Sequence, residues 1–116
     1  MWKSMSLVAA LSFASVGAAA QTSPSGLIDP DEFKDRQDCL YRETGRMIAT
    51  HGTSAAALDD IAKAAVQLCS QAVRARLLRA ASSSARGEEL VRYDRIQTER
   101  RALAIGRELK GKAAAP

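Results

Sequence analysis

The first amphipathic pattern in the chain begins at Asp29 and ends at Gly52. Aspartate is a typical N-cap, the proline that follows it suits the first helical position, and glycine is common just after a helix end. The residues predicted to face inward recur about every three or four positions: Phe33, Leu40, Thr44, Met47 and Ile48. On the outer surface, acid–base pairs four residues apart, such as Glu32 with Arg36, are expected to support the helix.

A second and clearer pattern follows after a turn of only a few residues. Thr53 or Ser54 can cap this helix, which continues to Ala80. Its predicted inner face consists of Leu58, Ile61, Ala62, Ala65, Leu68, Cys69, Ala72, Val73, Leu77 and Ala80. Because the intervening turn is so short, residues 29–80 are predicted to fold as an antiparallel helical hairpin.

The two cysteines of the chain fit this hairpin. At 1.5 Å per residue, Cys39 lies roughly 18 Å before the turn and Cys69 roughly 22 Å after it, so both fall at nearly the same level. A disulfide between them would close a loop of about 30 residues and stabilise a small domain by about 3 to 4 kcal/mol. We therefore predict a structural Cys39–Cys69 disulfide. A redox pair would more often have C-x-x-C spacing, and a metal site would need further ligands.

The C-terminal part of the chain predicts a third helix. The serine-rich segment 81–87 is expected to be a linker or a kink, although a continuous helix through it is an alternative. An arginine-rich helix is predicted over residues 88–112, with a frayed tail at 113–116. Its apolar residues form two incomplete stripes on nearly opposite sides, one with Leu90, Tyr93 and Ile96 and one with Val91 and Ile105. The helix therefore either packs on the hairpin with one side and meets a partner with the other, or projects as an exposed arm. The predicted fold class is all-α.

The N-terminal residues have the features of a secretory signal peptide over 1–20. Lys3 precedes an apolar run too short to span a bilayer, and Ala18 and Ala20 suit a cleavage site. Met5 is an alternative start. Residues 21–28 are predicted to be a disordered leader. We expect an exported product, periplasmic in a Gram-negative cell and otherwise secreted, with no transmembrane segment after cleavage.

Charge is distributed unevenly along the exported part. Residues 29–62 contain eight acids and four bases, whereas residues 63–112 contain twelve bases and five acids. Arginine makes paired hydrogen bonds to carboxylates and phosphates, so the C-terminal half could recognise an acidic protein or an anionic envelope component. The predicted partner-binding residues are Arg92, Arg95, Arg100, Arg101 and Arg107. The alternative is an ordinary solvated face. Nucleic acid is not expected as the ligand of an exported chain with so few aromatic residues.

Few residues point to catalysis, a cofactor or a metal. His51 is the only histidine and falls at a predicted helix end, and adjacent carboxylates such as Asp59 and Asp60 diverge by about 100° on a helix. We therefore expect no enzyme, but an exported interaction module. The alternative is a periplasmic acid-stress holdase, because full protonation of the carboxylates leaves 17 positive side chains after residue 20. A homodimer is also compatible with the two apolar stripes.

Overall fold

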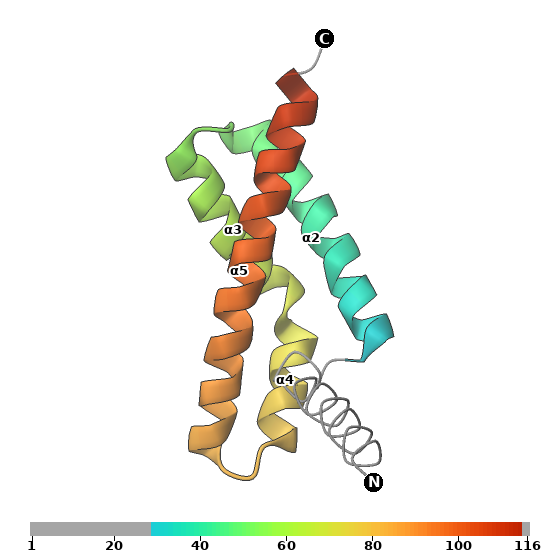
Figure 1. Cartoon of the computed structure of the whole chain (residues 1–116), viewed down its shortest axis with the longest axis vertical. Coiled ribbons are helices and arrows are strands. Elements are labelled where there is room, and N and C mark those ends of the chain that lie inside the picture. The colour runs from blue at the N-terminus through green and yellow to red at the C-terminus, as the bar shows by residue number, and fades with distance from the viewer. Residues whose placement is uncertain (1–28, 115–116) are drawn as a thin grey trace, which may run out of the picture.

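The computed structural model describes residues 29–114, which form four helices (Figure 1). Their bounds are Pro30–His51 for α2, Ala55–Cys69 for α3, Gln71–Ala80 for α4 and Ser84–Ala114 for α5. The all-α fold class is confirmed. The predicted signal peptide and leader lie outside the described residues. Among α2 to α5, none is both long enough and apolar enough to cross a bilayer.

The ends of the hairpin helices follow the predicted capping residues. One carboxylate oxygen of Asp29 accepts hydrogen bonds from the backbone N–H groups of Asp31 and Glu32, at 3.0 and 3.3 Å. At the other end of α2, Gly52 has φ of 85° and donates its N–H to the carbonyl oxygen of Ile48. Glycine suits this conformation because other residues strain there. Of the two possible caps for α3, it is Ser54 that accepts from the N–H of Ala57.

The predicted second helix is divided at Ser70 into α3 and α4. Ser70 leaves the helical conformation, with φ of −105° and ψ of 7°. Its side chain accepts a hydrogen bond from Arg36 Nη1 at 3.2 Å, so a contact with another helix coincides with the bend. The backbone hydrogen bonds from Ser70 to Val66 and from Arg74 to Ser70 continue across this point. The division is therefore a bend in the chain direction rather than a loop.

The third helix is longer than predicted and begins four residues earlier. The hydroxyl of Ser83 accepts from the N–H of Arg86, which caps the new start, and the linker shrinks to residues 81–83. Gly87 lies inside α5 and is buried, where an added Cβ would come within 3.1 Å of a methyl carbon of Leu78. The glycine that favours a linker in the sequence thus permits close packing of α5 on α4.

Helix α5 packs along the hairpin and does not project as an arm. It runs parallel to α2 and antiparallel to α3 and α4, and its C-terminal half lies over α2 and α3 (Figure 1). The buried core contains residues of α2, α3 and α5: Leu40, Ala62, Ala65, Val66, Ala102 and Ile105. The small residues of α3 allow this close approach. Packing of the third helix on the hairpin, one of the two predicted arrangements, is therefore observed, whereas the predicted partner on its other side stays a prediction.

The prediction of the inner face of the second helix is only partly correct. Leu58, Ile61 and Leu77 are buried as expected, but Leu68 is 49% exposed and Val66 is buried in its place. Because α2 and α5 flank α3, the buried arc centres near Ala65 and Val66, and Leu68 lies roughly a quarter turn or more away from it.

Candidate functional site

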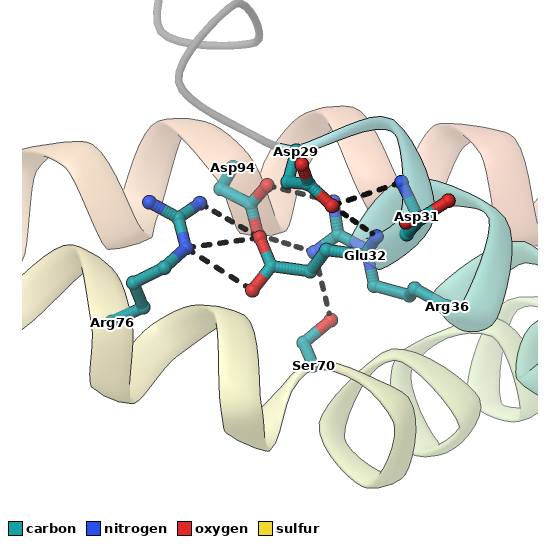
Figure 2. Close-up of polar contacts among 7 residues, drawn as sticks. All are labelled: Asp29, Asp31, Glu32, Arg36, Ser70, Arg76 and Asp94. Carbon is teal, nitrogen blue, oxygen red and sulfur yellow. Dashed lines mark hydrogen bonds and ion pairs between the residues drawn. The ribbon is translucent and has the colours of Figure 1, made fainter.

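A buried ion pair joins the N-terminal half of α2 to the middle of α5. Arg36 Nη1 and Nη2 donate to the two carboxylate oxygens of Asp94 at 2.8 and 3.0 Å, and Nη1 also reaches Ser70 (Figure 2). The side chain of Arg36 is 1% exposed and that of Asp94 is 13% exposed. The predicted surface pair of Glu32 with Arg36 is therefore wrong, because Arg36 turns inward.

Glu32 pairs instead with a residue of α4. Its carboxylate accepts from Arg76 Nε at 3.0 and 3.1 Å and from Nη2 at 2.8 Å (Figure 2). The hydrogen bond that Arg76 donates to Glu32 raises the pKa of the Arg76 guanidinium. Both side chains are partly exposed, at 31% for Arg76 and 22% for Glu32. Together the two ion pairs join the start of α2 to α4 and α5.

The predicted disulfide is confirmed. Cys39 of α2 and Cys69 at the end of α3 are bonded, with their Cα atoms 5.8 Å apart. Cys39 follows Arg36 by three residues and Cys69 precedes Ser70, so the covalent bond and the Arg36–Ser70 hydrogen bond hold the same two segments. The bend between α3 and α4 is thereby anchored to α2 twice.

A further contact joins the C-terminal half of α5 to α2. The hydroxyl of Tyr41 donates to Glu108 Oε1 at 3.0 Å, and Glu108 also pairs with Lys112 one turn later. The hydrogen bond raises the pKa of the Tyr41 phenol and lowers the pKa of the Glu108 carboxyl. The contact therefore favours a protonated Tyr41 and an ionised Glu108. The Tyr41–Glu108 hydrogen bond and the Arg36–Asp94 pair therefore hold α5 against α2 in both halves of its length.

The five predicted partner-binding arginines occupy different environments on α5. Arg101 is half-buried, with its guanidinium carbon 4.6 Å from the centroid of the Phe33 ring. Burial, and after it the charge of Arg36, lower the pKa of the Arg101 guanidinium. Arg95 is exposed and lies 4.0 Å from Glu99 Oε2. Arg101 therefore belongs to the packing of α5 on α2, and Arg95 is partly neutralised by its own helix.

The other three arginines are exposed along one side of α5, and the last of them, Arg107, also lines a shallow groove between α5 and the start of α3. We call this side the outer face of α5, and define it by its exposed residues: Arg92, Tyr93, Ile96, Arg100, Ala104, Arg107 and Lys110. The cations of α5 that form ion pairs are Arg86, Arg95 and Lys112. Over residues 29–114, none of the four cations of the outer face forms an ion pair. This face therefore combines unpaired positive charge with exposed apolar side chains.

The sequence pattern places Tyr93 and Ile96 in an apolar stripe and does not predict that they share a surface with the arginines. In the structure each is 41% exposed and lies on the outer face of α5 among them. The spacing of the residues contains a signal for this shared face, because the row is separated alternately by three and four positions. Its members are residues 93, 96, 100, 103, 107 and 110. Arginine at two of these positions makes the row difficult to identify as one stripe.

A groove next to the bend at Ser70 is a second basic region. It has a volume of about 530 Å³ and lies between α3, α4 and α5, with Lys63, Arg74 and Arg95 around an apolar floor of Val66 and Val91. Lys63 pairs with Asp59 at 3.1 Å and Arg95 lies near Glu99, which leaves Arg74 as the only one of the three cations without an ion pair in the described region. The groove therefore offers less free charge than the outer face of α5.

His51 at the end of α2 is exposed, as are Asp59 and Asp60 near the start of α3. His51 and Asp60 line one open groove of about 410 Å³. Across the described part of the chain, no three His, Cys, Asp or Glu side chains are grouped so that they could hold a metal ion.

Comparison of the chain with protein-family models, curated proteins and solved structures finds no match. Inference about function therefore rests on the geometry of residues 29–114.

Proposed function

We propose that the protein is an exported, non-enzymatic interaction module that binds a protein or an anionic envelope component through the outer face of α5. One observation carries the proposal: Arg92, Arg100 and Arg107 are exposed without ion pairs within residues 29–114, next to exposed Tyr93 and Ile96. Guanidinium groups form paired hydrogen bonds to carboxylates and phosphates, and tyrosine and arginine are enriched in binding sites.

The remainder of the fold supports this role by holding α5 in place. The disulfide joins α2 to α3, and the Arg36–Asp94 pair and the Tyr41–Glu108 hydrogen bond join α5 to α2 without using a residue of the outer face. A partner therefore meets a helix that is already formed and fixed, which reduces the entropy lost on binding. The predicted export is consistent with the disulfide, because such bonds persist in oxidising compartments.

Replacing two arginines of the outer face is expected to abolish capture of a partner. The test compares R100S/R107S with R74S/R79S, which removes two exposed arginines of α4 and so changes the net charge equally. Each oxidised protein is crosslinked in envelope extract and the captured components are identified by mass spectrometry. We expect a component that is retained by wild-type protein and R74S/R79S and lost with R100S/R107S, while the helical circular dichroism is unchanged. Equal capture by all three proteins would contradict the proposal.

The alternative function, an acid-activated holdase, is favoured by the buried Arg36–Asp94 pair. Arg36 contacts no carboxylate other than Asp94 within the described residues, so loss of this counter-charge leaves a buried cation that destabilises the fold. Opening of the helices would then expose the apolar core.

The holdase alternative predicts that the protein suppresses aggregation of a denatured client at about pH 3 but not at neutral pH. It further predicts that D94N shows part of this activity at neutral pH, because the substitution removes the counter-charge of the buried Arg36. Light scattering of an acid-denatured client measures both effects. A client that aggregates equally with and without the protein at low pH would eliminate this alternative.

A further inference from the structure

We infer that the outer face of α5 pairs side by side with an acidic amphipathic helix of a partner protein. The inference rests on the proposed function and specifies the partner's chemistry. It starts from the spacing along α5, where Tyr93, Arg100 and Arg107 alternate with Ile96, Leu103 and Lys110 at intervals of three and four residues. This is the spacing of a helix-pairing seam.

The structure places this row on one straight and accessible ridge. Helix α5 is continuous from Ser84 to Ala114, and successive residues of the row one heptad apart are separated by roughly 10 Å along the axis. Five of the six side chains are exposed, and the sixth, Leu103, is half-buried at the edge next to α3. A partner helix can therefore lie along about 25 Å of α5 without moving any other helix.

Charge decides the chemistry of the partner. Within the row the charged residues are all positive, namely Arg100, Arg107 and Lys110, and Arg92 lies beside it. A partner helix with carboxylates one heptad apart can pair with Arg100 and Arg107 while its apolar residues contact Ile96 and Leu103. Such charge-assisted pairs are among the stronger hydrogen bonds, and they also fix the register of the two helices.

The position of the arginines argues against a membrane surface as the occupant. A helix that lies in a membrane interface has a broad apolar face with its cations on the polar side. On α5, Arg100 stands between Ile96 and Leu103 within the row, so inserting those two side chains among acyl chains would carry a guanidinium with them. Carboxylates on a protein helix satisfy this arginine without that cost.

Charge also argues against a second copy of this chain. Two α5 helices in parallel register would bring Arg100 opposite Arg100 and Arg107 opposite Arg107, which is repulsive. The nearest acid along the same side is Glu89, which is already paired with Arg86. A homodimer through this face would therefore leave most of the arginines without carboxylate partners.

The test uses a defined probe with the full chain, expressed for export and purified in oxidised form. The probe is a labelled four-heptad helical peptide with leucine at one seam position and glutamate at the other, and its control carries glutamine in place of glutamate. Fluorescence anisotropy measures binding at low salt. We expect the glutamate peptide to bind at least about tenfold more tightly than the glutamine peptide. We expect R100S/R107S to remove this difference, and R74S/R79S to retain it.

Other results would overturn the inference. If neither peptide binds but vesicles with phosphatidylglycerol bind in an Arg100- and Arg107-dependent way, the occupant is a membrane, and the proposed function survives without this inference. Concentration-dependent dimerisation lost in R100S/R107S, without peptide binding, assigns the face to a second copy and also overturns it. Peptide binding that is unchanged in R100S/R107S places the site elsewhere. If, in addition, capture of every envelope component is independent of these arginines, the results contradict the proposed function as well.

Discussion

Replacing Asp94 with asparagine is expected to lower the free energy of unfolding by about 3 to 5 kcal/mol. The substitution preserves the shape of the side chain but leaves the Arg36 guanidinium buried without a counter-charge, since its side chain is 1% exposed. Urea unfolding of the oxidised protein, followed by circular dichroism, measures the change. The effect is large because it is the cost of a desolvated charge rather than the loss of an attraction.

Two further variants separate this cost from the value of the ion pair itself. R36M/D94L removes both charges and is expected to be more stable than D94N, because apolar residues of similar volume can replace a buried pair at little cost. R76Q removes a cation from the more exposed pair with Glu32 and is expected to cost about 1 kcal/mol or less. If D94N were as stable as wild type, the buried pair would not be a principal support of the fold.

Removing the disulfide with C39A/C69A is expected to cost about 3 to 4 kcal/mol. The bond joins residues 30 positions apart, and its removal increases the conformational entropy of the unfolded chain. The same urea titration measures the loss. The folded topology should persist, because the Arg36–Ser70 hydrogen bond holds the same two segments and the buried core joins α2 and α3 to α5.

Wild-type protein treated with a reductant provides the matched control for this variant. It is expected to unfold at nearly the same urea concentration as C39A/C69A, since both lack the covalent loop. A reduced protein as stable as the oxidised one would show that the bond contributes nothing to the equilibrium. A C39A/C69A protein far less stable than the reduced form would instead indicate damage from the alanine substitutions.

Local features of the structure could be predicted from the sequence because their causes are local. Asp29 and Gly52 mark the ends of α2, and Ser54 marks the start of α3, through hydrogen bonds to residues only a few positions away. The disulfide was also predictable, because two helices joined by a short turn place Cys39 and Cys69 at one level. In each case residue type and sequence distance alone fix the outcome.

The bend at Ser70 and the buried ion pair depend on residues that are distant in sequence. Arg36 and Asp94 are 58 positions apart, and Arg36 resembles a member of a surface pair when only its near neighbours are considered. A faint signal existed, because Arg36 precedes the buried residues Leu40 and Thr44 at intervals of four. A charged residue in such a row either interrupts a face or is buried with a partner, and only the tertiary structure distinguishes the two.

The sequence predicts that the candidate site is rich in arginine, but it does not predict which arginines form the exposed surface. The excess of arginine in the C-terminal helix was evident, yet Arg101 packs against Phe33 while Arg100 next to it is exposed. Neighbours on a helix point about 100° apart, so the direction of the buried face decides which arginine is available. That direction is set by how α5 packs on α2 and α3. The two incomplete apolar stripes in the sequence of α5 do not determine this packing.

Both cysteines precede α5 along the chain, so the disulfide links α2 to α3 without any residue of the last helix. Leu40 and Ala65 of these two helices are buried in one cluster with Ala102 and Ile105 of α5. A chain truncated before α5 would therefore keep the covalent link but leave these apolar side chains exposed. The C-terminal helix is thus the element that covers the core, which the disulfide alone leaves open.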